Sequence, residues 1–542
     1  MYRLSGISFW KVLTPLVFLV FLSPVVIVLF SLFGEYSENW NHLYNFVLID
    51  YITNSLILVT GVSLITLFIG TGTAWLITNF NFHGKRFFEW ALILPLAIPP
   101  YILAYTFTGL FDSYGTLNNL SRDLFQLGDG VNIFPNVRNI YGAVVVFSFT
   151  LYPYVYLVSR SAFINQSRSM LESGRMLGLS QFGIFYKLSL PLIRPAMIGG
   201  VMLVVMETLS DFGAVEHFAV QTFTTGIFRT WYGMGDLNTA MQLASMLLIF
   251  VGVFLFIERK SRKQAAFTTN ASNFRPIQID QLSGVYSVLA FIACLMPILI
   301  GFLLPISELL VWAINYNLSF FNEKFIKTAM NTVYLSIAAA ILCSTLALLI
   351  NFSIRLNKSR FLNILNSFLS IGYAVPGLIL AVGIVQLMTF LDRSLFLSSN
   401  FILTGSLIGL ILAYIIKSYA LSNSTFESGM ENISPRIDDS ARVLKSTGWN
   451  LLGRIHFPLL KTSFLTSILL VTSEVVKELP ATLILRPFNF DTLAVSTYIY
   501  AAEERMFEAA APSIAIIIVG LIPIIILTKM IRSSRLGDNL GQ

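Results

Sequence analysis

The sequence predicts an all-α polytopic membrane protein with about twelve transmembrane helices, arranged as two six-helix halves that repeat in parallel. The 542 residues are 56% hydrophobic and 12% charged, whereas soluble domains carry about 25% charged residues. Apolar runs long enough to cross about 30 Å of hydrocarbon recur along the whole chain. Polar residues near the ends of several runs return at a fixed offset in the other half. Together these observations exclude a soluble globular domain.

The first half contains six apolar runs, each interpreted as one span. They centre on Val12–Phe33, Ser55–Ile77, Phe88–Phe111, Ile140–Val158, Ala196–Gly213 and Thr239–Ile257. The first run is too long for the core of a signal peptide and lacks a small-residue cleavage site, so it is kept as a span. A polar segment follows from Glu258 to Gln281 and is predicted to be a cytoplasmic linker.

The second half contains six further runs. They centre on Val285–Leu304, Thr332–Phe352, Phe361–Leu387, Phe401–Ile416, Phe464–Leu485 and Pro512–Leu527. The predicted organisation is therefore a first half at residues 1–257, a linker at 258–281 and a second half at 282–542.

Lysine and arginine side chains gather in alternate connections, and this asymmetry predicts the orientation of the chain. They precede the first span, lie between the fourth and fifth, and follow the second, sixth, eighth and twelfth: Arg3, Lys11, Lys85, Arg86, Arg160, Arg168, Arg175, Lys187, Arg194, Arg259, Lys260, Arg262, Lys263, Arg355, Lys358, Arg360, Lys529, Arg532 and Arg535. Both termini are therefore expected on the cytoplasmic side.

The two halves repeat residue by residue. Asn54 and Pro99 return as Asn331 and Pro376, 277 positions later, and after the fourth span the offset becomes 267. The longer connection at 112–139 in the first half accounts for the difference. Because six spans is an even number, both halves enter the membrane in the same direction, and an axis along the membrane normal is expected to relate them. A translocation path would then lie between the halves.

A polar connection in each half contains the same short motif. The first copy is Glu172-Ser173-Gly174-Arg175-Met176-Leu177-Gly178, followed after nine residues by Leu188-Ser189-Leu190-Pro191. The second is Asp439-Ser440-Ala441, with Lys445 at the position of Gly178 and Ile455-His456-Phe457-Pro458 at its end.

The spacing predicts a short amphipathic helix from Met170 to Gly178, a left-handed Gly178 that ends it, and a second short helix up to Leu190. Such a helix-turn-helix, here called a knob, would offer a rigid surface to a soluble partner; the first spans Met170–Leu190 and the second contains Asp439–Pro458. The alternative is an ordinary connecting loop, which a matched pair of loops disfavours. Because a lysine with positive φ is strained, Lys445 predicts that the second knob turns differently.

Four carboxylates mark the ends of the fifth and eleventh spans. Glu207 and Asp211, like Glu474 and Glu478, are spaced i, i+4 and are predicted to share one helix face. Carboxylates at membrane depth usually face a bundle interior or a water-filled cavity. The four are therefore candidates for lining the path and for transient contact with a hard cation. The alternative is a static network in which Lys477 and Arg486 neutralise Glu474 or Glu478.

No enzyme chemistry is predicted. The sequence contains no G-x-x-x-x-G-K-[ST] phosphate-binding motif, and its four histidines form no nucleophile-base constellation. No cofactor is therefore expected on this chain, and ATP hydrolysis would need separate subunits. Cys294 and Cys343 lie within apolar runs, without disulfide or metal-site spacing. The net charge of +7 reflects basic loops beside membrane lipid and does not indicate nucleic acid.

The paired motif resembles E-A-A-x-x-x-G-x(9)-I-x-L-P, the cytoplasmic coupling loop of ABC-importer permeases. Glu207-Thr-Leu-Ser-Asp-Phe-Gly-Ala-Val-Glu-His-Phe, Lys477-Glu-Leu-Pro-Ala-Thr-Leu-Ile-Leu-Arg-Pro-Phe and Leu94-Pro-Leu-Ala-Ile-Pro-Pro-Tyr101 are similar to the ferric-iron-type permeases of bacterial importers. The similarity covers nearly the whole chain, including the fused two-half layout.

The resemblance implies an inner-membrane permease subunit of a binding-protein-dependent ABC transporter. Two ATP-binding cassette subunits would grip the coupling loops, and a periplasmic solute-binding protein would deliver ferric iron. Relatives that move thiamine, polyamines, phosphonates or sugar phosphates are similar enough to keep those cargoes as alternatives. The competing class is a secondary transporter, which has no need of paired docking knobs. Stimulation of ATP hydrolysis by a co-purified partner would distinguish the two classes.

Overall fold

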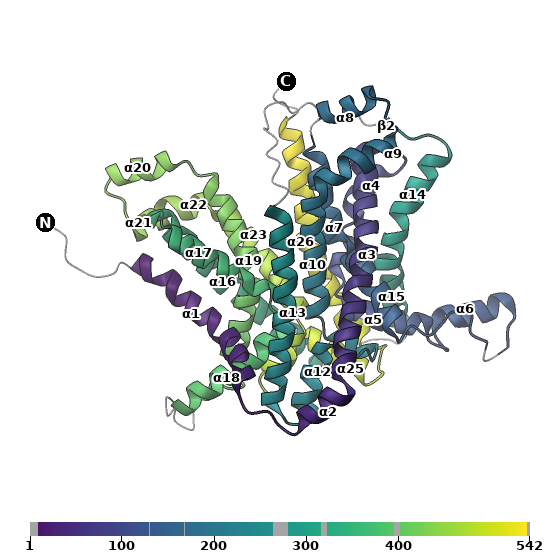
Figure 1. Cartoon of the computed structure of the whole chain (residues 1–542), viewed down its shortest axis with the longest axis horizontal. Coiled ribbons are helices and arrows are strands. Elements are labelled where there is room, and N and C mark those ends of the chain that lie inside the picture. The colour runs from purple at the N-terminus through teal and green to yellow at the C-terminus, as the bar shows by residue number, and fades with distance from the viewer. Residues whose placement is uncertain are drawn as a thin grey trace. The chain divides into compact units, whose positions relative to one another are not determined.

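The computed structural model describes residues 9–128, 131–166, 168–263, 280–315, 322–394 and 402–538 (Figure 1). Helices form almost all of it, and the one strand pairing in these residues is a two-residue parallel bridge between β1 (Phe80–Asn81) and β2 (Asp280–Gln281). Nine helices of the described chain are long and apolar enough to cross a membrane, or eleven if each of two bent pairs is one span. The all-α polytopic fold class is confirmed.

The helices gather into two compact units. Unit 1 comprises Met1–Ser37, Ile227–Ser245 and Ser319–Ser496, and unit 2 comprises Glu38–Gly226, Met246–Leu318 and Thr497–Gln542. Three helices begin in one unit and end in the other: α12 (Phe223–Phe228), α13 (Leu237–Lys263) and α25 (Leu493–Ala502).

Unit 2 holds most helices of the first half, together with the first and last spans of the second half. Its elements besides the shared helices are α2 (Asn39–Phe46), α3 (Leu48–Asn79), α4 (Lys85–Ala91), α5 (Pro100–Phe111), α6 (Thr116–Phe125), α7 (Ile140–Ile164), α8 (Arg168–Met176), α9 (Gln181–Ile184), α10 (Leu190–Ser210), α11 (Gly213–His217), α14 (Val285–Ile298), α15 (Leu304–Asn315) and α26 (Ala510–Asp538).

Unit 1 holds the other helices of the second half, together with the first span of the chain. Its elements besides the shared helices are α1 (Phe9–Phe30), α16 (Glu323–Asn357), α17 (Arg360–Leu369), α18 (Gly377–Ser394), α19 (Leu407–Glu431), α20 (Pro435–Val443), α21 (Trp449–Leu451), α22 (Phe457–Leu459), α23 (Lys461–Lys477) and α24 (Pro480–Leu485).

The core of unit 2 is the close packing of α3, α7 and α10. A Cβ atom added at Gly70 of α3 would lie 2.7 Å from the Cβ of Val155 in α7, and one at Gly200 of α10 would lie 3.0 Å from the Val155 Cα. Lipid supplies no hydrophobic force between helices, so close backbone approach at small residues is what holds them together. Both glycines are needed at this crossing.

The corresponding crossing in unit 1 uses hydrogen bonds. The repeat places Ala347, Ser422 and Ser467 in α16, α19 and α23 where unit 2 has Gly70, Val155 and Gly200. The Ser467 hydroxyl donates to the Ser422 Oγ at 2.8 Å, and the Ser467 and Ser344 hydroxyls lie 2.7 Å apart. The same three-helix core is thus held by glycine contacts in one unit and by interhelical serine bonds in the other.

The first span of each half packs with helices of the other half. In unit 1, a Cβ at Gly383 of α18 would lie 2.5 Å from the Pro24 carbonyl oxygen of α1. In unit 2, the Phe291 ring of α14 packs edge-on against Phe88 of α4, with centroids 5.0 Å apart. The two compact units of the structure therefore contain different sets of spans from the two halves defined by the sequence repeat. The sequence boundaries of the two halves stay a prediction.

Each of the twelve predicted spans overlaps a helix of the structure, but the third and the ninth are broken near their middles, and the fifth and the eleventh run past helix ends at Ser210 and Lys477. The third, predicted from Phe88 to Phe111, bends by 92° between the segments Lys85–Ala97 and Pro100–Phe125. The ninth, predicted from Phe361 to Leu387, is broken between α17 and α18. The repeat-matched Pro99 and Pro376 stand at these breaks, and proline lacks the amide hydrogen that a continuous helix requires.

The predicted linker is also shorter than expected. The helix α13 continues to Lys263, so the first six residues of Glu258–Gln281 are helical, and Asp280–Gln281 forms β2. The remainder, 264–279, lies outside the described residues.

Candidate functional site

The first predicted coupling loop is a helix-turn-helix at one end of unit 2 (Figure 1). Its first helix, α8, ends at Met176, and Gly178 follows with φ +78°. The Leu179 amide donates to the Gly174 carbonyl at 3.1 Å and the Gly178 amide to the Arg175 carbonyl at 3.0 Å, which together satisfy the last turn of the helix. The Ser180 hydroxyl then accepts from the Gly183 amide and caps α9.

The second loop turns in the same way, which contradicts the prediction from Lys445. Lys445 has φ +60° and occupies the left-handed position of Gly178. The Ser446 amide donates to the Ala441 carbonyl at 2.9 Å and the Lys445 amide to the Arg442 carbonyl at 3.0 Å, which repeats the first loop at an offset of 267. Because the cost of a left-handed lysine is about 1–2 kcal/mol, two closing hydrogen bonds are enough to hold the turn.

A small residue lets the first helix of each loop, here called the docking helix (α8 or α20), pack closely against the segment that follows it. Gly174 and Ala441 are buried while their motif neighbours Ser173 and Ser440 are exposed. A Cβ at Gly174 would lie 2.5 Å from the Leu188 Cδ1. This explains a small residue at the third motif position.

Both turns present an exposed apolar pair. Met176 and Leu177 are 88% and 82% exposed, and their counterparts Val443 and Leu444 are 83% and 80% exposed. The acidic motif residues Glu172 and Asp439 are exposed on the same helices. Each knob therefore combines one acidic side chain with two apolar ones.

The segments after the two turns differ. In the first loop a π-helical stretch, Phe185–Ser189, runs straight into α10, which includes Leu190 and Pro191. In the second loop, the helix that contains Pro458 is bent by 75° from α23. The predicted second short helix is thus present in both loops but is continuous with the span only in the first.

The carboxylates Asp211 and Glu478 do not share a helix face with Glu207 and Glu474, contrary to the prediction. The helix α10 ends at Ser210 and α23 ends at Lys477, and the next residue in each case is extended. The Asp211 Oδ1 accepts from the Ala214 amide at 2.8 Å and so caps α11. The two residues therefore occupy equivalent capping positions, one in each unit.

Glu478 is held by three hydrogen bonds and an ion pair. Its Oε1 accepts from the Ala481 amide at 3.0 Å, and its Oε2 accepts from the Thr482 amide at 3.0 Å and the Thr482 hydroxyl at 2.7 Å. The Lys417 Nζ lies 3.5 Å away, with both charged side chains largely buried. Gly377 leaves room for the carboxylate, since a Cβ there would lie 2.7 Å from Oε1.

The predicted neutralising partners are present in part. Lys477 pairs with Glu474 at 3.3 Å, while Arg486 pairs with Asp491 and not with Glu478. Glu207 is half-buried in α10. Within the residues that the structure describes, no group of three or more His, Cys, Asp or Glu side chains is placed to hold a metal ion.

Comparisons with known proteins identify the family. Residues 66–259 match the binding-protein-dependent transport system inner membrane component. The Fe(3+)-transport system permease protein FbpB 2 of Haemophilus influenzae is 23% identical over 485 residues, 89% of this chain and 90% of that one. The ferric transport system permease protein FbpB of Actinobacillus pleuropneumoniae is 23% identical over 507 residues, 88% of this chain and 70% of that one. The chain is a permease of the binding-protein-dependent transport family.

A shorter relative has a different cargo in its name. The molybdenum transport system permease protein ModB of Escherichia coli is 28% identical over 202 residues, 35% of this chain and 85% of that one. The ferric relatives, in contrast, align with both halves of the permease. The permease is accordingly a multi-pass inner-membrane subunit of an ABC importer, and its role is transport.

An ion pair braces the first loop of the permease. The Arg175 Nη2 of α8 lies 2.6 Å from the Asp280 Oδ2 of β2, and the side-chain Nε2 of Gln181 in α9 donates to the same oxygen. In the second loop the counterpart Arg442 pairs with Asp439 of its own helix at 3.6 Å. The first loop is thus tied to the last residues of the predicted linker, at β2.

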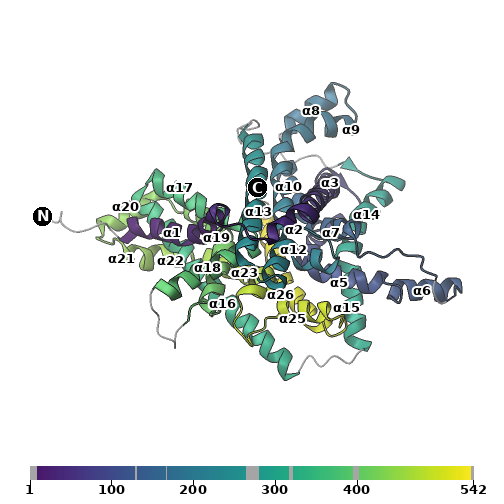
Figure 2. The same cartoon turned by 60° about the horizontal axis from the view of Figure 1, so that its bottom comes forward.

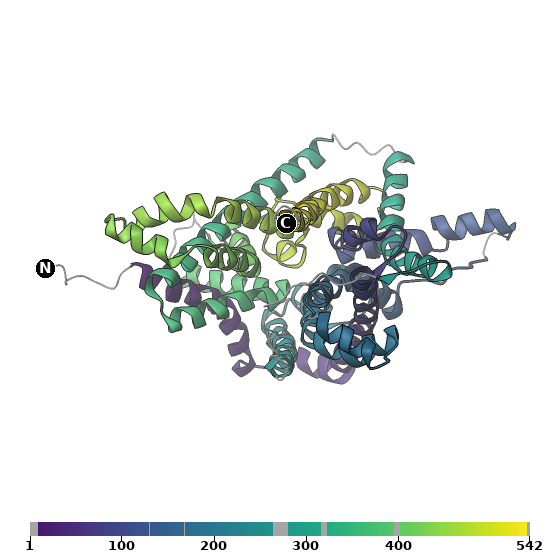
Figure 3. The ribbon, with the colours of Figure 1, turned by 90° about the horizontal axis from the view of Figure 1, so that it is seen from above.

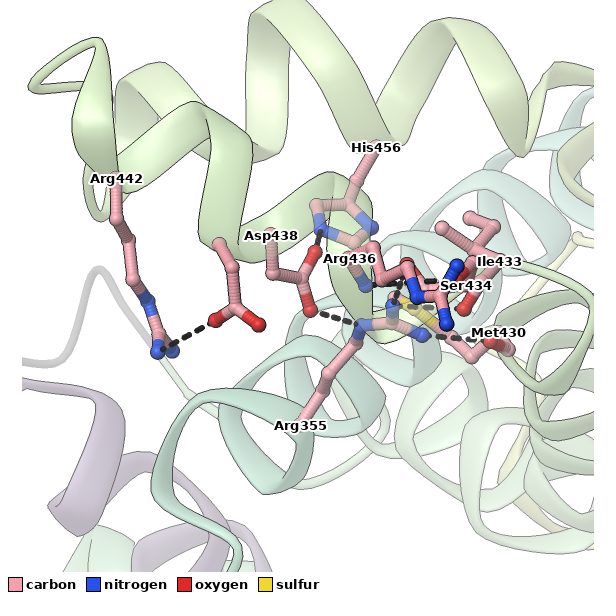
Figure 4. Close-up of polar contacts among 9 residues, drawn as sticks. Arg355, Met430, Ile433, Ser434, Arg436, Asp438, Arg442 and His456 are labelled. Carbon is pink, nitrogen blue, oxygen red and sulfur yellow. Dashed lines mark hydrogen bonds and ion pairs between the residues drawn. The ribbon is translucent and has the colours of Figure 1, made fainter.

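The second loop is braced by a buried network that the sequence did not reveal (Figure 4). The Arg355 Nε of α16 donates to the Asp438 Oδ2 at 2.7 Å, and the His456 Nε2 lies 2.8 Å from the Asp438 Oδ1. The Arg355 guanidinium also donates to the Met430 and Ile433 carbonyls at the end of α19. One carboxylate thus joins the docking helix α20 to α16 and to the segment before α23.

Aromatic side chains complete the contact between the second loop and its unit, where α21 lies beside α1 (Figure 2). The Trp449 ring of α21 packs against Trp10 of α1, with centroids 4.8 Å apart. His456 is fully buried against Phe352 of α16. The sequence offered one signal for this arrangement: two aspartates in tandem at the motif, where only one is needed.

Proposed function

We propose that this permease is the membrane subunit of an ATP-driven importer for ferric iron, which a periplasmic binding protein delivers. The observation that supports the cargo is the similarity to two ferric permeases over 88–89% of this chain, both halves included. The molybdenum relative matches only 35% of the chain. Thiamine, polyamine, phosphonate and sugar-phosphate cargoes remain outcomes that a transport assay can return.

Two ATPase subunits, one on each knob, would drive transport. The matched knobs support this, because Met176 and Leu177 repeat as Val443 and Leu444 on the same left-handed turn. Exposed apolar side chains beside one acidic residue suit a soluble partner with an apolar groove and a basic rim. We place both knobs and both chain termini on the cytoplasmic side, because lysines and arginines gather in those connections.

The four carboxylates Glu207, Asp211, Glu474 and Glu478 would act on the cargo at the ends of α10 and α23 that lie away from the knobs. Glu207 and Glu474 lie in the last turns of α10 and α23, one in each unit, and Asp211 and Glu478 cap the next short helices. Acidic side chains at these repeat-related positions would attract a cation released by the binding protein. Any contact with iron is transient, and the ion is cargo.

The docking assignment is tested with an apolar-to-acidic change. Leu444→Asp should weaken ATPase association about tenfold or more, since a buried leucine contributes about 1.5–3 kcal/mol. Phe488→Asp is the matched control, because Phe488 is 100% exposed and follows the opposite end of α23 in the same unit. Co-purification of the ATPase reports both variants. Equal association of the Leu444 variant and the control would contradict docking on this turn.

The cargo is tested in proteoliposomes that contain the permease, its ATPase and its binding protein. Ferric iron should be taken up only with ATP, and loaded binding protein should stimulate ATP hydrolysis. Molybdate and thiamine serve as competing cargoes. Uptake of one of these in place of iron would replace the cargo and keep the importer class, whereas uptake driven by an ion gradient without ATP would indicate a secondary transporter.

A further inference from the structure

The connection between α5 and α7 in unit 2 buries polar side chains and exposes apolar ones, which is the reverse of what a segment surrounded by water shows. It contains the helix α6, which projects sideways from the unit in all three views (Figures 1, 2 and 3). Asn118 is fully buried and Arg122 is 8% exposed, whereas Leu120 and Leu124 are 53% and 69% exposed. A helix that faced water would show the opposite arrangement.

The buried polar groups are satisfied by the connection itself. The Asn118 amide donates to the carbonyls of Phe111 and Asp112 at 3.1 and 3.0 Å, and its oxygen accepts from the Phe134 amide at 3.0 Å. Arg122 donates from Nε to the Val131 carbonyl at 3.2 Å and from Nη2 to the Ser113 carbonyl. The chain after α6 therefore folds back over its polar face and leaves the apolar face outward.

The outward leucines form one stripe. Leu117, which is partly exposed, Leu120 and Leu124 follow the i, i+3, i+7 spacing of a single helix face. The exposed Asp123 borders this stripe, turned about 60° from Leu120 and about 100° from Leu124 around the helix axis. Phe125 adds an aromatic ring that is 67% exposed.

The start of α6 is tied to a fixed depth on a spanning helix. The Thr116 hydroxyl donates to the Glu308 Oε1 of α15 at 2.6 Å. Glu308 stands seven residues before Asn315, where the 31-residue candidate span Val285–Asn315 ends. That span is about 46 Å long and the hydrocarbon layer about 30 Å thick, so each end extends about 8 Å beyond the layer. Glu308 lies about 10 Å from the end, at the edge of the hydrocarbon.

Two exposed tyrosines stand on either side of the helix in the sequence. Tyr114, just before α6, is 84% exposed, and Tyr141, in the first turn of α7, is 77% exposed. Tyrosine is enriched where membrane hydrocarbon meets water, because its ring is apolar and its hydroxyl is polar. Both observations are those expected of a helix at the membrane surface.

We propose that α6 is an interfacial anchor, whose leucine stripe lies in the lipid at the end of the bundle opposite α8 and α9. Amphipathic helices of this kind bury their apolar face about 5–10 Å below the headgroups. The corresponding connection between α18 and α19 in the other half is shorter, and the repeat offset falls by ten there. The proposal is independent of the cargo and concerns how the connection between the third and fourth spans is held.

The test measures which solvent surrounds α6 in the whole permease. Leu120→Cys, Leu124→Cys and Asp123→Cys are each labelled with a nitroxide after reconstitution into vesicles of phosphatidylethanolamine and phosphatidylglycerol. Cys294 and Cys343 are fully buried, so the unchanged permease is the label-free control. Collisions with oxygen, which concentrates in lipid, are compared with collisions with a water-soluble nickel complex.

Lipid burial predicts a several-fold larger oxygen-to-nickel ratio at positions 120 and 124 than at 123. Equal, nickel-accessible labels at all three positions would show a water-facing helix and overturn the proposal. Labels at 120 and 124 shielded from both reagents would indicate a protein contact instead. If that shielding arises only when the binding protein is added, the stripe is a docking surface for that protein, and the lipid anchor is wrong.

Discussion

Asp438 and Asp439 are adjacent in the sequence and have opposite surroundings. The Asp438 side chain is 13% exposed and lies between Arg355 and His456, whereas that of Asp439 is 72% exposed and pairs with Arg442 of its own helix. The first is held inside unit 1 and the second faces solvent beside the exposed Leu444. We therefore assign stability of the loop to Asp438 and partner contact to Asp439.

This assignment predicts that two matched variants separate the two roles. Asp438→Asn removes the charge that neutralises Arg355 and should lower the free energy of unfolding by about 3 kcal/mol, as when one partner of a buried pair is lost. Asp439→Asn should change stability by less than about 1 kcal/mol, but should reduce ATPase association. Thermal unfolding in detergent and co-purification of the ATPase measure the two effects. Equal stability of both variants would contradict the bracing role of Asp438.

We predict that Glu478 contributes mainly to the stability of the fold and not to contact with the cargo. In Glu478→Gln, one side-chain NH₂ would face amide or hydroxyl donors of Ala481 and Thr482, and Lys417 would lose its partner. The free energy of unfolding should fall by about 3 kcal/mol and folded yield should drop. Glu207→Gln should keep its folded yield while ferric uptake declines. Full folded yield with lost uptake in the Glu478 variant would instead show a direct role in transport.

At the scale of elements, the sequence predicted the spans better than their ends. Apolar residues continue past Ser210 as Phe212-Gly-Ala-Val, so hydropathy does not reveal that α10 has stopped. The break is set by Asp211, whose carboxylate caps the next helix, and this bond depends on the fold. Pro99 and Pro376 were visible as repeat markers, and their effect on the helix could have been inferred from proline chemistry alone.

The knobs show where a sequence rule holds and where packing overrides it. Both copies and their turns follow from the spacing, but the lysine at the glycine position wrongly predicted a different second turn. A left-handed lysine costs only about 1–2 kcal/mol, which the closing bonds of a helix end can offset. The bracing partners Asp280 and Arg355 lie far from their loops in sequence, so no local pattern could identify them.

The shared turn predicts opposite effects of glycine at the two positions. Lys445→Gly should stabilise the second turn by about 1 kcal/mol, because glycine reaches positive φ without strain. Gly178→Ala should destabilise the first turn by a similar amount. The cost is backbone strain at positive φ and not a steric clash, since a Cβ there would meet nothing within 4 Å. Hydrogen exchange should slow at the Ser446 amide and accelerate at the Leu179 amide. Faster exchange at Ser446 would show that Lys445 makes a stabilising contact that glycine lacks.

At the scale of the whole molecule, the sequence repeat predicted two similar halves, and the structure groups their spans into two units with exchanged first spans. The repeat is visible because corresponding residues keep their offset. The exchange is not visible, because α1 and α14 are apolar along most of their length, and this pattern does not indicate which helices they contact. Only the packing of Pro24 against Gly383 and of Phe291 against Phe88 reveals it.

The exchange predicts that neither half is stable alone. Residues 1–270 and 271–542, produced as two chains, should each give little folded protein, because α1 lacks α16–α18 in the first chain and α14–α15 lack α3–α5 in the second. Produced together they should assemble, since close packing drives helix association in lipid and needs no covalent link. Co-purification through a tag on one chain measures assembly, and ATP-dependent uptake measures function. A Gly383→Leu change in the second chain is the matched control: it would block the approach of Pro24 and should reduce co-purification. A first chain that folds alone in full yield would show that α1 does not depend on the second half.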